Sequence, residues 1–153
     1  MLDRILAFLK TPETGTPQEF ADSDIAVVAL LIRAAMTDAD FDPEERAVIR
    51  HLVAETFHFS EVEIERLIAQ AEMEESNTLD LHRWSQAIKQ NHDEAARIAL
   101  IEKMWEVVYA DGRLDDYEAN LLRRVAGLLY VPDRASGEAR KRVLARLEKR
   151  REA

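Results

Sequence analysis

The sequence lacks cysteine altogether, and it has only four glycines and four prolines among its 153 residues. Without cysteine the chain can form no disulfide, no thiolate zinc site, no iron–sulfur cluster and no thiol nucleophile. The scarcity of glycine and proline argues against a β fold rich in turns. A chain of this length can bury roughly 68–70% of its unfolded surface. We therefore expect one mostly helical domain that needs no disulfide to fold.

Long hydrophobic runs are also missing. The longest uncharged apolar stretch, Ile25 to Ile32, has eight residues, whereas a helix needs about 20 to span a bilayer. The first 30 residues show no signal-peptide pattern. Together with the absence of cysteine, these features predict a soluble cytoplasmic protein with no transmembrane segment.

Positive charge is scarce outside the C-terminus. The chain has 21 basic and 30 acidic residues, a net charge of −9, and residues 134–153 alone hold eight basic and three acidic groups. The acidic remainder repels phosphate, so we expect no nucleic-acid partner. The basic tail is interpreted as a C-terminal helix whose cations suit its dipole and neutralise an acidic neighbour. Its most clustered cations are Lys141, Arg142, Lys149, Arg150 and Arg151.

Apolar residues recur at three- and four-residue spacing along most of the chain, which is typical of amphipathic helices. The segment over residues 25–36 is apolar nearly all round, which predicts a central buried helix. Trp84 and Trp105 lie on apolar faces and are expected to anchor the core. The fold class is thus all-α, a bundle of about seven to eight helices. Helices are expected around residues 25–36, 48–57, 64–71, 81–88, 98–108, 121–129 and 143–147.

The ends of several helices are marked. Ser60 and Glu63 have the spacing of a capping box, Pro43 follows Asp42 at an expected first helical position, and Pro132 follows an apolar run. Short connections between the helices are therefore expected.

An N-terminal segment precedes the main helices. Its apolar residues have helical spacing, and a linker containing Pro12, Gly15 and Pro17 follows. Residues 1–19 are predicted to form a short amphipathic helix and linker, and residues 20–153 the helical domain. With one net positive charge, residues 1–10 are expected to pack on the domain or on a partner rather than on a membrane. The apolar residues are Leu2, Ile5, Leu6 and Leu9.

Residues 32–59 match residues 105–132 at a constant offset of 73, which indicates an internal repeat with halves over about 22–76 and 93–150. Both copies read as a helix, an acidic turn and a second helix. The turns share the spacing Asp-x-x-x-Asp-x-x-Glu. The matching acidic residues are Asp38, Asp42 and Glu45 in the first copy and Asp111, Asp115 and Glu118 in the second.

Helix capping explains part of this pattern. Asp42 and Asp115 stand at N-cap positions, and Glu45 and Glu118 complete capping boxes. Capping leaves Asp38 and Asp111 unexplained, because they end helices whose dipole disfavours an anion. A bound cation would relieve their repulsion, and oxygen donors select Ca²⁺, Mg²⁺ or Mn²⁺.

Neither turn is an EF-hand. The sixth position of the first copy holds Pro43 where glycine is required, and the twelfth holds Ile49 where glutamate is required. Glu55 and His58 have the helical spacing of a di-iron site, but the repeat supplies no second pair. No nucleophile motif or phosphate loop is present. We therefore expect no enzyme activity, no catalytic residue and no organic cofactor.

The tandem acidic turns, Thr37 to Glu45 and Tyr109 to Glu118, resemble those of the TerB-like family, and the similarity runs from about residue 22 to residue 147. The family includes the tellurite-resistance protein TerB and the TerB-like domain of a DnaJ-type co-chaperone. The resemblance implies an all-helical bundle built from two related halves. It also implies a divalent metal held by the acidic turns, and a role in stress or scaffolding rather than catalysis.

Two functional hypotheses follow. The first is a non-enzymatic TerB-like module of a tellurite-resistance or stress-response type, which binds a hard divalent cation at its acidic turns. The alternative is a metal-independent protein-interaction or co-chaperone-type scaffold domain that uses its acidic surface. Both predict a protein partner.

Overall fold

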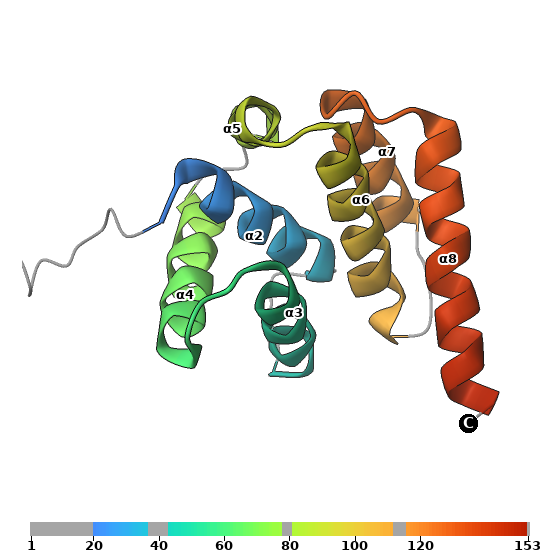
Figure 1. The fold of residues 1–153 in the computed structure, drawn as a ribbon, viewed down its shortest axis with the longest axis horizontal. Coiled ribbons are helices and arrows are strands. Elements are labelled where there is room, and N and C mark those ends of the chain that lie inside the picture. Colours follow the sequence, from blue (N-terminus) through green and yellow to red (C-terminus); the bar gives the residue numbers. More distant parts are fainter. Residues whose placement is uncertain (1–19, 37–42, 78–80, 112–115, 153) are drawn as a thin grey trace, which may run out of the picture.

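The computed structural model describes residues 20–36, 43–77, 81–111 and 116–152, and within them the chain forms seven α-helices, one short 3₁₀ helix and no strand (Figure 1). The all-α prediction is confirmed. The helix and linker expected over residues 1–19 lie outside the described residues. The α-helices are α2 (Asp22–Ala35), α3 (Pro43–Thr56), α4 (Glu61–Asn77), α5 (Leu81–Asn91), α6 (Glu94–Val108), α7 (Asp116–Leu128) and α8 (Asp133–Glu152), and the 3₁₀ helix is η2 (Tyr109–Asp111).

Helix α2 is the centre of the fold, as its apolar circumference predicts. Eleven of its 14 residues are buried, and it contacts α3, α4, α5, α6 and α7. In Figure 1 it lies in the middle of the molecule, with α4 along one edge and α8 along the other. A helix without a polar face must be covered on all sides, so the neighbouring helices are arranged around it.

One continuous hydrophobic core joins the helices, and every described α-helix contributes to it. The two tryptophans anchor it as expected, Trp84 on α5 and Trp105 on α6, both less than a tenth exposed. The indole Nε1 of Trp105 donates a hydrogen bond of 3.1 Å to the Ser136 hydroxyl on α8. That bond satisfies the buried polar end of the ring, as a buried indole requires.

The starts of the helices in the two halves agree with the 73-residue offset of the sequence to within one residue. Helix α3 begins at Pro43 and α7 at Asp116, 73 residues later. In the first half α2 packs most extensively on α4, and in the second half α6 packs most extensively on α8. Helix α5 connects the two sets of three helices.

Local capping interactions mark both the starts and the ends of helices where the sequence indicates them. The Ser60 hydroxyl accepts the Glu63 N–H at 3.2 Å, and the Glu63 carboxylate accepts the Ser60 N–H at 2.8 Å, so the capping box is confirmed. Helix α7 ends in a Schellman motif, in which the Val131 N–H donates to the Ala126 carbonyl at 2.8 Å. Tyr130 takes the left-handed position there, with φ of 59°, although glycine is the usual residue.

The basic C-terminal helix pairs with α6, as the sequence predicts. Arg142 and Arg146 hold the Glu102 carboxylate at 2.8 and 2.7 Å, and Arg146 also binds Glu106 at 3.1 Å. Arg150 lies 4.0 Å from Glu106. The residue numbers of the paired side chains increase together along the two helices, so α6 and α8 run in the same direction.

No helix in the described part of the chain is long and apolar enough to cross a membrane.

The burial of α2 predicts a large effect of truncating its side chains. We expect Leu31→Ala to lower the free energy of unfolding by about 2–5 kcal/mol, because Leu31 is fully buried and its removal leaves a cavity. The matched control is Leu144→Ala on α8, where the side chain is 38% exposed and the loss should stay within about 0.5 kcal/mol. Urea unfolding measures both, and equal losses would contradict the central role of α2.

The arginine network predicts an acid-dependent contribution from Glu102. Burial raises the pKa of Glu102, but hydrogen bonds and charge interactions with Arg142 and Arg146 outweigh it, so the pKa lies below its ordinary 4.5. A depressed pKa means that the stabilisation is present above pH 4.5 and is lost as the pH falls through the folded-state pKa.

We therefore expect Glu102→Gln to cost about 1 kcal/mol at pH 7, allowing for screening at a partly exposed site. Its difference from the wild type should shrink toward zero in acid. Urea unfolding across pH 3–7, with the exposed Glu148→Gln as control, measures this; a pH-independent difference would show that the cost is not ionic.

Candidate functional site

The first acidic turn lies between α2 and α3. Helix α2 ends at Ala35, and its C-cap residue Met36 has an extended backbone whose N–H still donates to the Ile32 carbonyl at 3.1 Å. Helix α3 starts at Pro43, with a half-buried Glu45 in its first turn. The predicted ligands Asp38 and Asp42 lie outside the described residues.

The second acidic turn lies between α6 and α7. Helix α6 tightens into η2, which ends at Asp111. Helix α7 starts at Asp116, and Glu118 in its first turn is only 3% exposed. The side chain of Asp111 and all of Asp115 lie outside the described residues. The Glu118 carboxylate lies near the N-terminus of α7, where the helix dipole favours a negative charge.

The structure brings the flanks of the two turns together. The Arg33 guanidinium, in the last turn of α2, lies 5.6 Å from the centre of the Tyr117 ring in the first turn of α7. Arg33 also donates to the Glu75 carboxylate on α4 at 3.3 Å. The helix that leads into the first acidic turn therefore contacts the helix that follows the second.

The metal-site prediction stays a prediction. Of its six residues, only Glu45 and Glu118 have side chains within the described ranges, at corresponding places in the first turns of α3 and α7. Among the side chains that the structure places, no group of three or more histidine, aspartate or glutamate residues could hold a metal ion.

Sequence reasoning missed two features near the candidate site. One is Arg33, whose role could have been suspected because it is the only charged residue in α2 beyond Asp24. The other is Glu75, which is 4% exposed but lies in a glutamate-rich stretch whose sequence does not mark one member as buried. Their pairing depends on the packing of α2 against α4.

The comparisons with known proteins agree with this architecture. Residues 24–141, most of the chain, match the family described as tellurite resistance protein TerB. The chain belongs to the TerB family. The match covers the TerB domain from the start of α2 into α8, and so includes both acidic turns. A search of curated proteins and a search of solved structures found no match.

The Arg33–Glu75 ion pair of this TerB domain predicts that removing one partner destabilises the fold more than removing both. We expect Arg33→Met to destabilise the fold by about 2 kcal/mol or more, because it leaves the Glu75 carboxylate buried without its guanidinium. The double variant Arg33→Met/Glu75→Met should recover most of that loss, since no charge then remains to be solvated.

Urea unfolding of both single variants and of the double variant measures the coupling free energy. Additive losses, with no recovery in the double variant, would show that the ion pair is not coupled.

Proposed function

We propose that this TerB domain is a non-enzymatic module of the tellurite-resistance type, which binds a hard divalent cation through its two acidic turns. Family membership supports the general class of module. The cation, Ca²⁺, Mg²⁺ or Mn²⁺, is the finer part of the proposal. It is carried by one observation: the helices that leave the two turns start 73 residues apart, each with a glutamate at its third residue.

The donor set fits a hard cation. The residues that would hold it are Asp38, Asp42 and Glu45 in one turn and Asp111, Asp115 and Glu118 in the other, and all are carboxylates. Carboxylate oxygens are the ligands that such ions prefer. When bound, the ion supplies positive charge that offsets the mutual repulsion of the aspartates.

A cation at these turns would act on the fold as well. Each turn connects two helices that also pack on the core, and Arg33 joins the end of α2 to the start of α7. An ion that fixes the end of one helix against the start of the next would therefore stabilise the contact between the two halves. We propose this stabilisation, rather than catalysis, as its effect.

Metal binding predicts a rise in thermal stability that depends on the second turn. At a cation concentration 100 times the dissociation constant, the gain is about 2.7 kcal/mol, or a rise in Tm of roughly 5–10 °C for a domain of this size. We expect Asp111→Asn/Asp115→Asn to reduce this rise sharply. The measurement is the Tm of chelator-stripped protein with and without Ca²⁺, Mg²⁺ or Mn²⁺.

The control for that double variant is Glu148→Gln/Glu152→Gln, which also removes two negative charges, but from exposed positions on α8. It should keep the full rise in Tm. If no ion raises the Tm of the unaltered protein, or if both double variants lose the rise equally, cation binding by the acidic turns is wrong.

A second candidate function has its own support. Helix α4 carries six glutamates and one arginine, and three of the glutamates pair with Arg33, Arg46 and Arg50 of α2 and α3, so an excess of two negative charges remains. On the same helix Val62 and Met73 are 61% and 64% exposed. An acidic helix with exposed apolar side chains suits a basic protein partner. Such binding would survive chelation and weaken as salt rises, because exposed charges are screened within about 10 Å at 0.1 M salt.

A further inference from the structure

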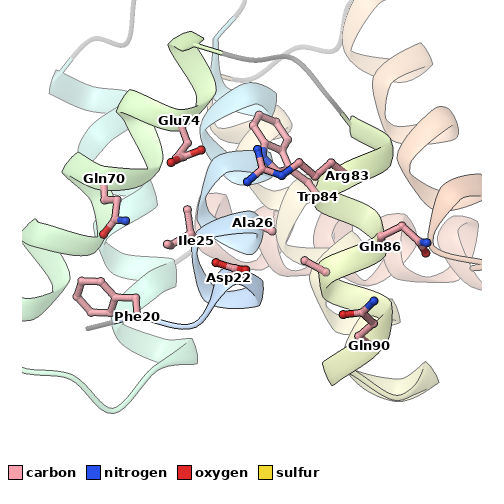
Figure 2. Close-up of a pocket in the computed structure, with 11 residues that line it drawn as sticks. Phe20, Asp22, Ile25, Ala26, Gln70, Glu74, Arg83, Trp84, Gln86 and Gln90 are labelled. Carbon is pink, nitrogen blue, oxygen red and sulfur yellow. The ribbon is translucent and has the colours of Figure 1, made fainter. Parts of the chain in front are cut away.

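A groove lies between α2, α4 and α5, away from the residues of the acidic turns (Figure 2). Its volume is about 470 Å³, which is within the range of ligand pockets. Helix α4 forms one wall and α5 the other, and the first turns of α2 lie between them. The family comparison and the acidic-turn proposal assign it no role.

The apolar residues of the groove are already covered by the core. Phe20, Ile25, Ala26 and Trp84 are each less than a tenth exposed, and Ala87 is half-buried. Burial of further apolar surface is therefore not what drives binding here. An occupant must be held by the polar groups of the groove, and its chemistry follows from theirs.

Five polar side chains that line the groove have no partner. They make no hydrogen bond or ion pair within the described part of the chain, whereas Glu72 and Glu75 of α4 are both paired. Two of the five are carboxylates, which only accept hydrogen bonds, and three are amides, which both accept and donate. The five are Asp22 of α2, Gln70 and Glu74 of α4, and Gln86 and Gln90 of α5.

A sixth polar group at the groove is buried. Trp84 is only 4% exposed, and its indole N–H donates no hydrogen bond to any residue that the structure describes. The other tryptophan differs, because the Trp105 N–H bonds the Ser136 hydroxyl. A buried indole N–H usually has an acceptor, so Trp84 is suited to bind an oxygen atom of an occupant.

These groups together match the main chain of a peptide that carries a cationic side chain. A peptide unit has one N–H donor and one C=O acceptor, which pair with the glutamine amides, and a carbonyl also accepts from the Trp84 N–H. A lysine or arginine side chain has only donors, which pair with Asp22 and Glu74. The lining holds two carboxylates and one guanidinium, that of Arg83, so its net charge also favours a cation.

The length of the groove corresponds to a short extended segment. Its lining runs from Arg83 to Gln90 along α5, which is about 10 Å at a rise of about 1.5 Å per residue. Three extended residues span about the same length. A helix suits the groove less well, because its main-chain N–H and C=O groups bond one another and leave nothing for the glutamine amides.

We propose that the groove between α2, α4 and α5 binds an extended, cationic segment of a partner protein. The main chain of about three residues bonds the glutamines and the Trp84 indole, and one lysine or arginine side chain meets Asp22 and Glu74. The inference rests on the second candidate function, because it names a site for the basic partner. It is independent of cation binding by the acidic turns.

The indole signals of the two tryptophans report binding directly. The test is an NMR titration of the ¹⁵N-labelled full chain with the peptide acetyl-Ala-Lys-Ala-amide, with Trp84→Phe identifying the Trp84 signal. The Trp84 indole N–H should shift saturably, whereas that of Trp105, already bonded to Ser136, should not. No shift of the Trp84 signal at about 10 mM peptide, where even a millimolar site is filled, would overturn the proposal.

Two altered peptides separate recognition of charge from recognition of the main chain. Replacing the lysine by glutamate should weaken binding about tenfold or more, because the hydrogen bonds to Asp22 and Glu74 are lost. A peptide with an N-methylated alanine after the lysine keeps the charge but lacks one N–H donor, and about fivefold weaker binding is expected. Equal affinities of the three peptides would contradict the proposed chemistry.

Substitutions in the protein locate the site. Asp22→Asn/Glu74→Gln should weaken binding of the lysine peptide about tenfold or more, because both anions are removed. Glu148→Gln/Glu152→Gln, with the same loss of two charges at exposed positions on α8, should leave the affinity unchanged. Equal weakening in the two double variants would show that net charge, and not the groove, binds the peptide.

Two further results distinguish a failure of this inference from a failure of the proposed functions. Asp111→Asn/Asp115→Asn should bind the peptide normally, so cation binding by the acidic turns stands or falls separately. A peptide that shifts only the signals around Val62 and Met73, and not that of Trp84, would keep a basic partner on the outer face of α4 and reject the groove as its site.

Discussion

The fold depends on the burial of α2. Because this helix offers water almost no polar face, it is stable only when other helices cover it, and α3, α4, α5, α6 and α7 all contact it. The same requirement places two features at the ends of this helix. The last turn of α2 leads into the first acidic turn, and its first turns line a groove between α4 and α5 (Figure 2). A single buried helix therefore positions both features.

Most of the fold could be predicted from the sequence, because its determinants are local or periodic. The apolar spacing indicated seven main helices, and Pro43 and Ser60 marked the starts of α3 and α4. The interpretation of the basic tail was also right, since Arg142 and Arg146 neutralise Glu102. Charge pairing between two amphipathic helices can be predicted from their opposite charges alone, before it is known which residues lie opposite one another.

The candidate sites were less predictable, because they depend on how distant helices meet. The sequence identified the acidic turns, but their neighbourhood follows from Arg33 of α2 reaching Tyr117 of α7. Likewise, no local pattern places Gln70 of α4 opposite Gln86 of α5 across a groove. The left-handed conformation of Tyr130 at the end of α7 has no local sequence signal either, since glycine is the usual residue at that position.

The ion pairs between the first and third helices have opposite polarity in the two halves. In the first half an arginine of α2 meets a glutamate of α4, and in the second half glutamates of α6 meet arginines of α8. Two similar halves in one chain risk assembling with exchanged partners during folding. Packing α4 on α6 would set glutamates against glutamates, a mismatch that costs free energy only in the wrong assembly. The reversed charges thus allow each half to recognise its own third helix.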